Sequence, residues 1–112
     1  MFAEVKSQLP VSGEGYDGDI ILLIKAAVAD LTKTDQIVLK GIVNITRDAQ
    51  TGVITDNSTI TDEYAILAIA TWCNMHIGNP PNYDNLEKAY KTMKGNMRMS
   101  KEYKAEPEEA GT

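Results

Sequence analysis

Apolar residues recur at helical spacing in four segments of this chain of 112 residues. In the first segment, Phe2, Val5 and Leu9 lie three or four residues apart, and Pro10 follows them. Residues on one face of an α-helix recur at this spacing, and proline ends helices. The pattern therefore predicts a short amphipathic helix over residues 2–9, followed by a glycine-containing loop.

The second segment, residues 16–34, is apolar on more than one side of the helix that it predicts. Ile20 and Ile24 belong to one stripe, and Ile21 and Leu22 extend the apolar surface further round the helix. A helix that is apolar on most faces is buried on more than one side. We expect a neighbouring copy of the chain to cover the second side, with Ile21 and Leu22 in the contact.

The region that follows is rich in β-branched residues. Two runs, residues 42–46 and 52–55, flank a short loop that ends in Gly52. Such runs, joined by a short glycine-containing loop, predict a β-hairpin over about residues 42–55. Because an isolated two-stranded hairpin is only marginally stable in water, it must pack on the helices or pair with a partner.

The third helical segment is apolar nearly all round between Tyr64 and Ile77. Thr61 before it is a suitable N-cap, and Gly78 with the prolines that follow ends the helix. We expect this to be the central helix of the core, with Trp72 buried in it.

The fourth segment predicts a helix from about residue 82 to about residue 99. One apolar stripe runs along it: Leu86, Tyr90, Met93 and Met97. Basic residues recur three or four positions apart on one flank: Lys88, Lys91, Lys94, Arg98 and Lys101. Such a flank is typical of a solvated helix face, and it also suits a partner that presents phosphate or acidic side chains.

Composition narrows the class of protein. The chain has 43% hydrophobic and 24% charged residues, as ordinary globular domains do, and a net charge of −5. The acidic balance disfavours general nucleic-acid binding. Cys73 is the only cysteine, and neither a leader pattern nor an apolar run of membrane-spanning length occurs. We therefore expect a protein of a reducing cytoplasm with no membrane segment.

No residue pattern supports catalysis or metal binding. His76 is the single histidine, three residues after Cys73, and a structural zinc site usually needs four such ligands. A cysteine nucleophile with a histidine base would need a third, orienting group. Capping explains the carboxylates at the predicted helix starts. We therefore expect no enzyme activity, no cofactor and no metal.

Two segments resemble a known family. The helix opened by residues 16–24 (Tyr-Asp-Gly-Asp-Ile-Ile-Leu-Leu-Ile) is similar to the second helix of phage head–tail connector proteins. The turn of residues 79–84 (Asn-Pro-Pro-Asn-Tyr-Asp) is similar to the one before their lysine-rich last helix. Helix order and length agree over nearly the whole chain, although the hairpin at residues 42–55 is longer than in the simplest members.

The resemblance implies a small helical bundle that forms a ring of about twelve copies beneath the portal protein of a tailed double-stranded DNA phage. Such a ring extends the DNA channel without sequence-specific binding. It also offers a platform to the next neck or tail-completion protein. A protein of this kind is made in the host cytoplasm and resides in the virion neck.

The sequence as a whole predicts a mainly α protein, a small four-helix bundle with a β-hairpin insertion. We expect one helical domain over residues 1–100 and a flexible, extended tail over residues 101–112, anchored on a partner through Tyr103. The expected contact residues for other copies, the portal or a tail protein are Ile21, Leu22, Lys91, Lys94, Arg98, Lys101 and Tyr103. The alternative is a small helical DNA-binding regulator that uses the last helix.

Overall fold

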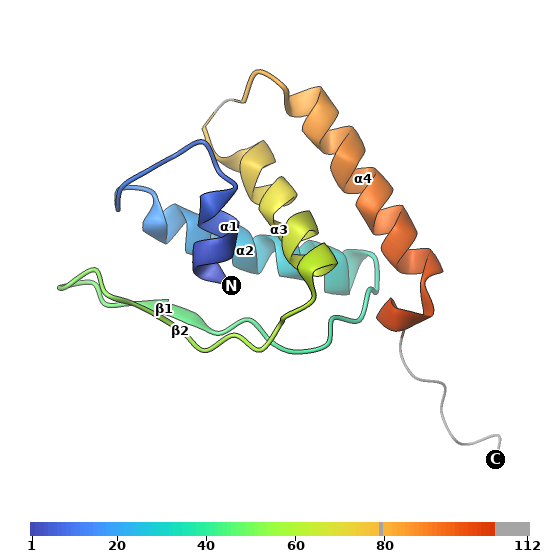
Figure 1. The fold of residues 1–112 in the computed structure, drawn as a ribbon, viewed down its shortest axis with the longest axis horizontal. Helices are drawn as coiled ribbons and strands as arrows, with labels where there is room; N and C mark the ends of the chain where they lie inside the picture. Colours follow the sequence, from blue (N-terminus) through green and yellow to red (C-terminus); the bar gives the residue numbers. More distant parts are fainter. Residues whose placement is uncertain (79, 105–112) are drawn as a thin grey trace, which may run out of the picture.

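The computed structural model describes residues 1–78 and 80–104, and it is mainly helical with one small antiparallel sheet (Figure 1). Its elements are, in chain order, α1 (Phe2–Ser7), α2 (Asp17–Ala29), η1 (Asp30–Thr34), β1 (Ile45–Arg47), β2 (Ile54–Asp56), α3 (Glu63–His76), α4 (Tyr83–Met99) and η2 (Lys101–Tyr103). Here η1 is a turn of π-helix and η2 is a turn of 3₁₀-helix. The predicted fold class, mainly α with a β-hairpin, is confirmed.

Helix α3 lies at the centre of the helical part, and α1, α2 and α4 all pack against it. Because α3 is apolar nearly all round, each neighbour meets a hydrophobic face, and Ala65 and Cys73 have no exposed surface. The helix starts at a different cap from the predicted one. Asp62, not Thr61, is the N-cap, and its Oδ1 accepts a hydrogen bond from the backbone N–H of Tyr64 at 3.0 Å.

Helix α2 is covered from two sides, by α3 and by β1. Its buried apolar residues are Ile20, Ile21, Ile24 and Ala27. The helix continues beyond Ala29 as the wider turn η1, and Gln36, with a φ of +56°, reverses the chain after it. Ile21 was expected in a contact with another copy; it is buried within the chain itself.

The β-hairpin forms as predicted, and its pairing extends beyond the two short strands. Ile45 lies opposite Asp56, and backbone hydrogen bonds continue the ladder to Asp48 near the turn and to Ile42 near the base. Ile45 turns inward and is 1% exposed, whereas Ile42 and Val53 are each 61% exposed. The hairpin projects beyond the helices on one side of the molecule (Figure 1).

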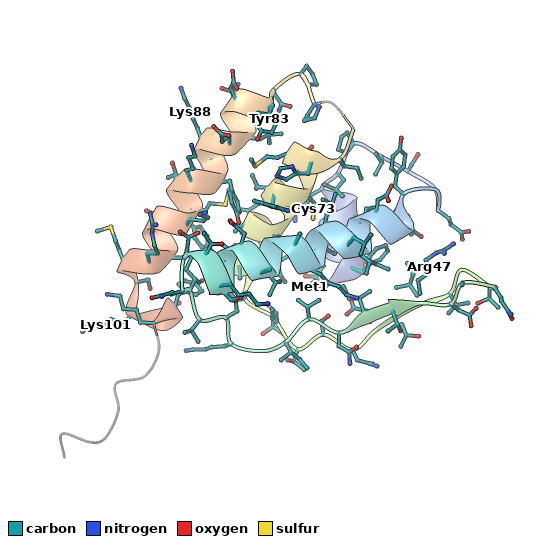
Figure 2. The ribbon with its side chains drawn as sticks, turned by 180° about the vertical axis from the view of Figure 1, so that it is seen from behind. Met1, Arg47, Cys73, Tyr83, Lys88 and Lys101 are labelled. Carbon is teal, nitrogen blue, oxygen red and sulfur yellow. The ribbon has the colours of Figure 1, made fainter. Side chains whose placement is uncertain are left out.

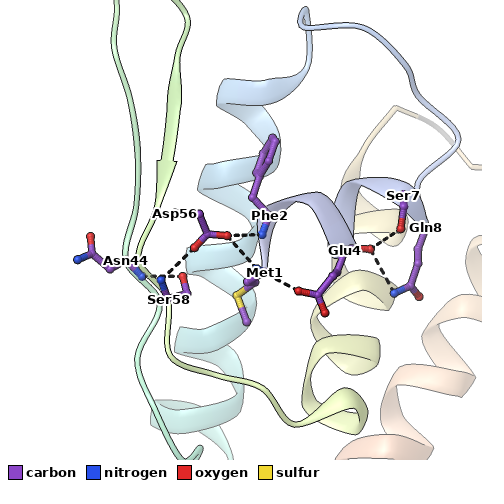
Figure 3. Close-up of polar contacts among 8 residues, drawn as sticks. All are labelled: Met1, Phe2, Glu4, Ser7, Gln8, Asn44, Asp56 and Ser58. Carbon is purple, nitrogen blue, oxygen red and sulfur yellow. Dashed lines mark hydrogen bonds and ion pairs between the residues drawn. The ribbon is translucent and has the colours of Figure 1, made fainter.

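The N-terminus of α1 is attached to the hairpin through Asp56 (Figure 3). The N-terminal ammonium lies 2.9 Å from Asp56 Oδ2, and the backbone N–H of Phe2 donates to the same oxygen at 2.6 Å. Burial disfavours the charged carboxylate, but these hydrogen bonds outweigh burial and hold the pKa of Asp56 well below its usual value. Burial likewise opposes the ammonium charge, yet hydrogen bonds to Asp56 and Glu4 raise its pKa. The pair ties α1 to β2.

Trp72 was predicted to be buried in the core; it packs against the core but is only half-buried. Its ring centroid lies 4.3 Å from that of His76 and 5.3 Å from that of Tyr90, at the seam between α3 and α4. A hollow opens along this seam. An aromatic ring placed there packs on one side and remains accessible on the other.

The last described residues pack on the body, and they do not form an extended tail. Residues 101–103 form η2, and Tyr103 is 8% exposed. The Tyr103 hydroxyl donates a hydrogen bond to Asp62, and the Tyr103 carbonyl oxygen accepts one from the backbone N–H of Val38 at 2.8 Å. The predicted boundary at residue 100 is therefore too early. Residues 105–112 of the predicted tail lie outside the described residues.

Candidate assembly surfaces

The two ends of the helical part differ in the elements that meet there. At one end α2 and α4 begin and α3 ends; we define it as residues 10–23, 74–78 and 80–86 and name it the acidic end. These segments contain four carboxylates and neither lysine nor arginine. At the opposite end, here named the basic end, residues 30–41, 60–64 and 94–104 meet. Figure 2 shows Tyr83 and Lys101 at opposite ends of α4.

Two adjoining hollows open at the acidic end. The first has a volume of about 280 Å³, and its lining includes Tyr16, Asp19, Leu22, Leu23, His76 and Ile77. The second, of about 570 Å³, lies between residues 10–16 and 80–82 and shares Tyr16 with the first. Leu22 is 66% exposed and Tyr16 is 43% exposed, so a large apolar surface faces solvent here.

Two residues of α2, Ile21 and Leu22, were predicted to contact another copy, and the structure places them on different sides of the helix. Ile21 is 6% exposed and packs inside the chain, whereas Leu22 lies at the rim of the first hollow. Adjacent residues of a helix point in different directions, so covering one side of α2 leaves the next side chain outside. Only Leu22 of this pair is accessible to another protein.

The basic flank of α4 is partly used inside the chain. Lys94 Nζ lies 3.0 Å from Asp30 Oδ2 and 2.5 Å from Asp35 Oδ2, and Arg98 lies 3.1 Å from Asp35 Oδ1. The buried Asp35 Oδ2 lacks a hydrogen bond of good angle, but the ammonium at 2.5 Å compensates its charge. Burial opposes the charge of Lys94, yet Asp35 and Asp30 raise its pKa. Lys94 and Arg98 therefore hold α4 to the end of α2.

The other residues predicted from this flank are open to solvent. Lys91 is 70% exposed and lies 3.4 Å from Glu87, one helical turn away. Lys101 has no ion pair within the described residues. The exposed side chains at the basic end include Lys33, Lys40, Met99, Lys101 and Lys104. Met99 is 83% exposed, the highest value among the exposed large apolar residues of the described chain.

A third hollow, which sequence reasoning missed, lies between α3 and α4. It has a volume of about 250 Å³, and its lining includes Asp30, Trp72, His76, Tyr83, Glu87 and Tyr90. The Tyr90 hydroxyl donates to Asp30 at 2.7 Å, and burial together with this carboxylate raises the pKa of Tyr90. The aromatic spacing, Trp72 to His76 on one helix and Tyr83 to Tyr90 on the next, was the available signal. Its acidic and basic groups already pair with each other, so the hollow is a structural seam.

The structure does not bring Cys73 and His76 together as a reactive pair. Cys73 has no exposed surface, and burial raises the pKa of its thiol to about 12. His76 is exposed and stacks beside Trp72. Within residues 1–78 and 80–104, no group of three or more histidine, cysteine, aspartate or glutamate side chains gathers as a metal site. In the same part of the chain, no helix combines the length and the apolar content that crossing a membrane requires.

Comparison with known proteins gives no assignment. No protein-family model matches the chain, and neither a curated protein nor a solved structure matches it significantly. Support for a function therefore comes from the sequence and the surfaces of the chain itself.

Proposed function

We propose that the protein is a structural, non-enzymatic subunit of a phage neck: a head–tail connector whose copies form a ring under the portal protein. The ring extends the DNA channel and provides the docking platform for the next neck or tail-completion protein. In this proposal the four helices act as the bundle of the connector family. One observation carries it: Leu22 is exposed beside an apolar hollow on a helix that α3 and β1 cover on two other sides.

Exposed large apolar residues lie at several separate places of the described chain, among them the first hollow and the hairpin. Tyr16 and Leu22 surround the first hollow, and Ile42 and Val53 lie on the outer face of the projecting hairpin. Contiguous exposed apolar surface marks sites of protein contact. Two such places suit a subunit with neighbours on more than one side. The resemblance of residues 16–24 and 79–84 to connector proteins names those neighbours as other copies, the portal and the next neck protein.

The charge of the chain favours a conduit over a DNA-gripping protein. A net charge of −5 suits a channel through which DNA slides, because tight phosphate contacts would hold it. The ion pairs of Lys94 and Arg98 with Asp35 reduce the basic surface of α4 further. The DNA-binding regulator therefore ranks second. Gel-shift titration at several salt concentrations separates the two, since a regulator binds one sequence in preference and a connector does not.

The test of the connector function is assembly with the portal protein encoded in the same genome. Native mass spectrometry compares the chain alone, the portal alone and their mixture. We expect the chain alone to be monomeric or weakly associated, and the mixture to contain many copies on each portal. A folded chain that never joins the portal contradicts the proposal.

A matched pair of variants controls for folding. Leu22→Ser should reduce the number of bound copies while the circular dichroism spectrum stays unchanged, because Leu22 contributes little to the core. Leu67→Ser replaces another exposed leucine, 41% exposed on α3 and beside α1, and should leave binding unchanged. Equal loss of binding in both variants would point to lost stability as the cause.

A further inference from the structure

We infer that copies of the chain associate head to tail, with the basic end of one copy seated on the acidic end of the next. The occupant of the apolar hollow at the acidic end is then the C-terminal end of α4 from a second copy. This inference rests on the proposed function, which requires copies to associate, and it assigns the two surfaces that meet.

The charges of the two ends are complementary. At the acidic end Glu14, Asp19 and Asp84 are exposed, whereas Asp17 is buried and paired with Lys6 at 2.6 Å. At the basic end Asp30 and Asp35 form ion pairs with Lys94 and Arg98. The exposed charges left there are Lys33, Lys40, Lys101 and Lys104 against Glu63 and Glu102. Opposite charges favour unlike ends meeting, and like charges oppose two acidic ends meeting.

The apolar features of the two ends also fit each other. Met99 is 83% exposed at the end of α4, and the first hollow at the acidic end presents Leu22 and Tyr16. Methionine is a flexible side chain that fills irregular apolar gaps. Lys101 follows Met99 by two residues, and Asp19, which lines the hollow, precedes Leu22 by three. Leu22 thus has Asp19 one turn before it and the exposed Lys25 one turn after it. Of these two charges only Asp19 lines the hollow into which Met99 with Lys101 would fit.

The arrangement of the helices lets one copy use both surfaces at once. The two ends lie at opposite ends of α4, as the labelled Tyr83 and Lys101 show (Figure 2). A contact between two different surfaces is heterologous, so it propagates from copy to copy and closes a ring when the rotation per copy allows. A two-fold pair through like ends would instead bury one end of each copy and leave the other unused.

Cross-linking between Leu22→Cys and Met99→Cys tests the contact directly. The two single variants of the full chain are mixed at high concentration and low salt, treated with a short bismaleimide, and analysed by mass spectrometry. Cys73 has no exposed surface, and unsubstituted chain measures its background. We expect cross-linked heterodimers in the mixture, about tenfold more than in either variant alone. Leu67→Cys in place of Leu22→Cys is the control and should return to background.

Charge reversal tests the orientation. Glu14→Lys with Asp19→Lys makes both ends basic, and Lys101→Glu with Lys104→Glu makes both ends acidic. Each double variant alone should lose association, whereas their mixture, and a chain with all four substitutions, should regain it. Lys88→Glu, an exposed lysine outside the basic end, should leave association unchanged. Contact between like ends predicts no rescue in the chain with all four substitutions.

The outcomes separate this inference from the connector function. Portal assembly without the heterodimer cross-link, in the free protein and on the portal, overturns the head-to-tail contact and leaves the connector function standing. The cross-link and the charge rescue in a chain that never joins a portal support the contact and overturn the connector function. Cross-links of equal yield in the mixture and in one single variant would show a two-fold contact, against the inference.

Discussion

Helices α2 and α4 both pack on α3 and each has a second, smaller contact, yet α2 buries more apolar residues than α4. β1 lies against α2, whereas the main contacts of α4 are with α3 and η2. In α4 only Tyr90 and Met97 are buried. In α2 the buried apolar residues are Ile20, Ile21, Ile24 and Ala27. The apolar content of a helix thus reports how much of its surface is covered, and not whether the covering element belongs to the same chain.

The two helices also differ in the residues that they expose to solvent. On α2 the exposed large apolar residue is Leu22, with the exposed Asp19 and Lys25 one turn to either side. On α4 the exposed residues include Lys88, Lys91 and Met99. An exposed leucine that lines an apolar hollow suits a contact with another protein, whereas exposed lysines on an amphipathic helix are explained by water alone.

The sharpest test of the comparison lies within α2. Ile24→Ala should lower the free energy of unfolding by about 2–5 kcal/mol, because Ile24 has no exposed surface. Leu22→Ala should change it by less than about 0.5 kcal/mol, because Leu22 is 66% exposed. Urea unfolding followed by circular dichroism measures both. Equal losses in the two variants would mean that the sides of α2 are wrongly assigned.

The extension of α4 gives the next largest effect. Deletion of all residues after Ser100 should lower the free energy of unfolding by about 2–4 kcal/mol, because it removes the buried Tyr103 ring and its hydrogen bonds with Asp62 and Val38. Deletion after Lys104 should change it by less than about 0.5 kcal/mol, because the sequence beyond holds no large apolar residue. Thermal unfolding compares both with the full chain. An unchanged melting temperature after the longer deletion would restore the boundary at residue 100.

The polar link between the two helices comes third. Asp35→Asn should lower the free energy of unfolding by about 1–3 kcal/mol, because it removes the negative partner of Arg98 and one of the two partners of Lys94, whose side chain is 16% exposed. Glu87→Gln, which affects only the exposed pair with Lys91 along α4, should cost less than about 0.5 kcal/mol. Urea unfolding of both variants measures the difference, and a cost for Glu87→Gln as large as for Asp35→Asn would show that the link between helices adds nothing.

The smallest effect concerns the hairpin that covers α2. The pKa of Asp56 is lowered from 3.8, so its contribution to stability is complete above pH 3.8 and falls as the pH drops further. The ammonium pKa is raised from 8.0, so its contribution is complete below pH 8.0 and falls as the pH rises through the raised value. Asp56→Asn should cost about 1 kcal/mol between these limits and flatten the pH dependence. In the Asp56→Asn variant, amide hydrogen exchange should accelerate in α2, which the hairpin contacts, and not in α4. Equal acceleration in both helices would contradict a role of the hairpin in covering α2.

Much of the fold could be predicted because it follows from local patterns. Helical spacing located all four helices, and β-branched runs around a glycine-containing loop located the hairpin. The N-cap of α3 could not be chosen, since Thr61 and Asp62 are adjacent and both cap well; only the backbone geometry selects Asp62. Tyr103 could not be placed either, because a single aromatic residue in a polar segment gives no periodic signal.

The residue types of the candidate surfaces could be predicted from the sequence, but the directions in which their side chains point could not. The apolar excess of α2 was visible in the sequence, but only packing against β1 shows that Ile21 is inside and Leu22 outside. The basic flank of α4 was visible too. Its pairing with Asp30 and Asp35 links positions 59 to 64 residues apart, which no local pattern reveals.

The longest-range polar contacts of α4 and η2 also set the order in which the chain can finish folding. Tyr90 reaches Asp30 across 60 positions, Arg98 reaches Asp35 across 63, and Tyr103 closes on Val38. During synthesis α2 and the hairpin leave the ribosome before these partners exist. The end of α2 stays uncovered until the last helix has been translated, because domains complete their packing only when distant segments are present. In the proposed head-to-tail contact, a copy can therefore offer its basic end to a neighbour only after α4 and η2 have been made.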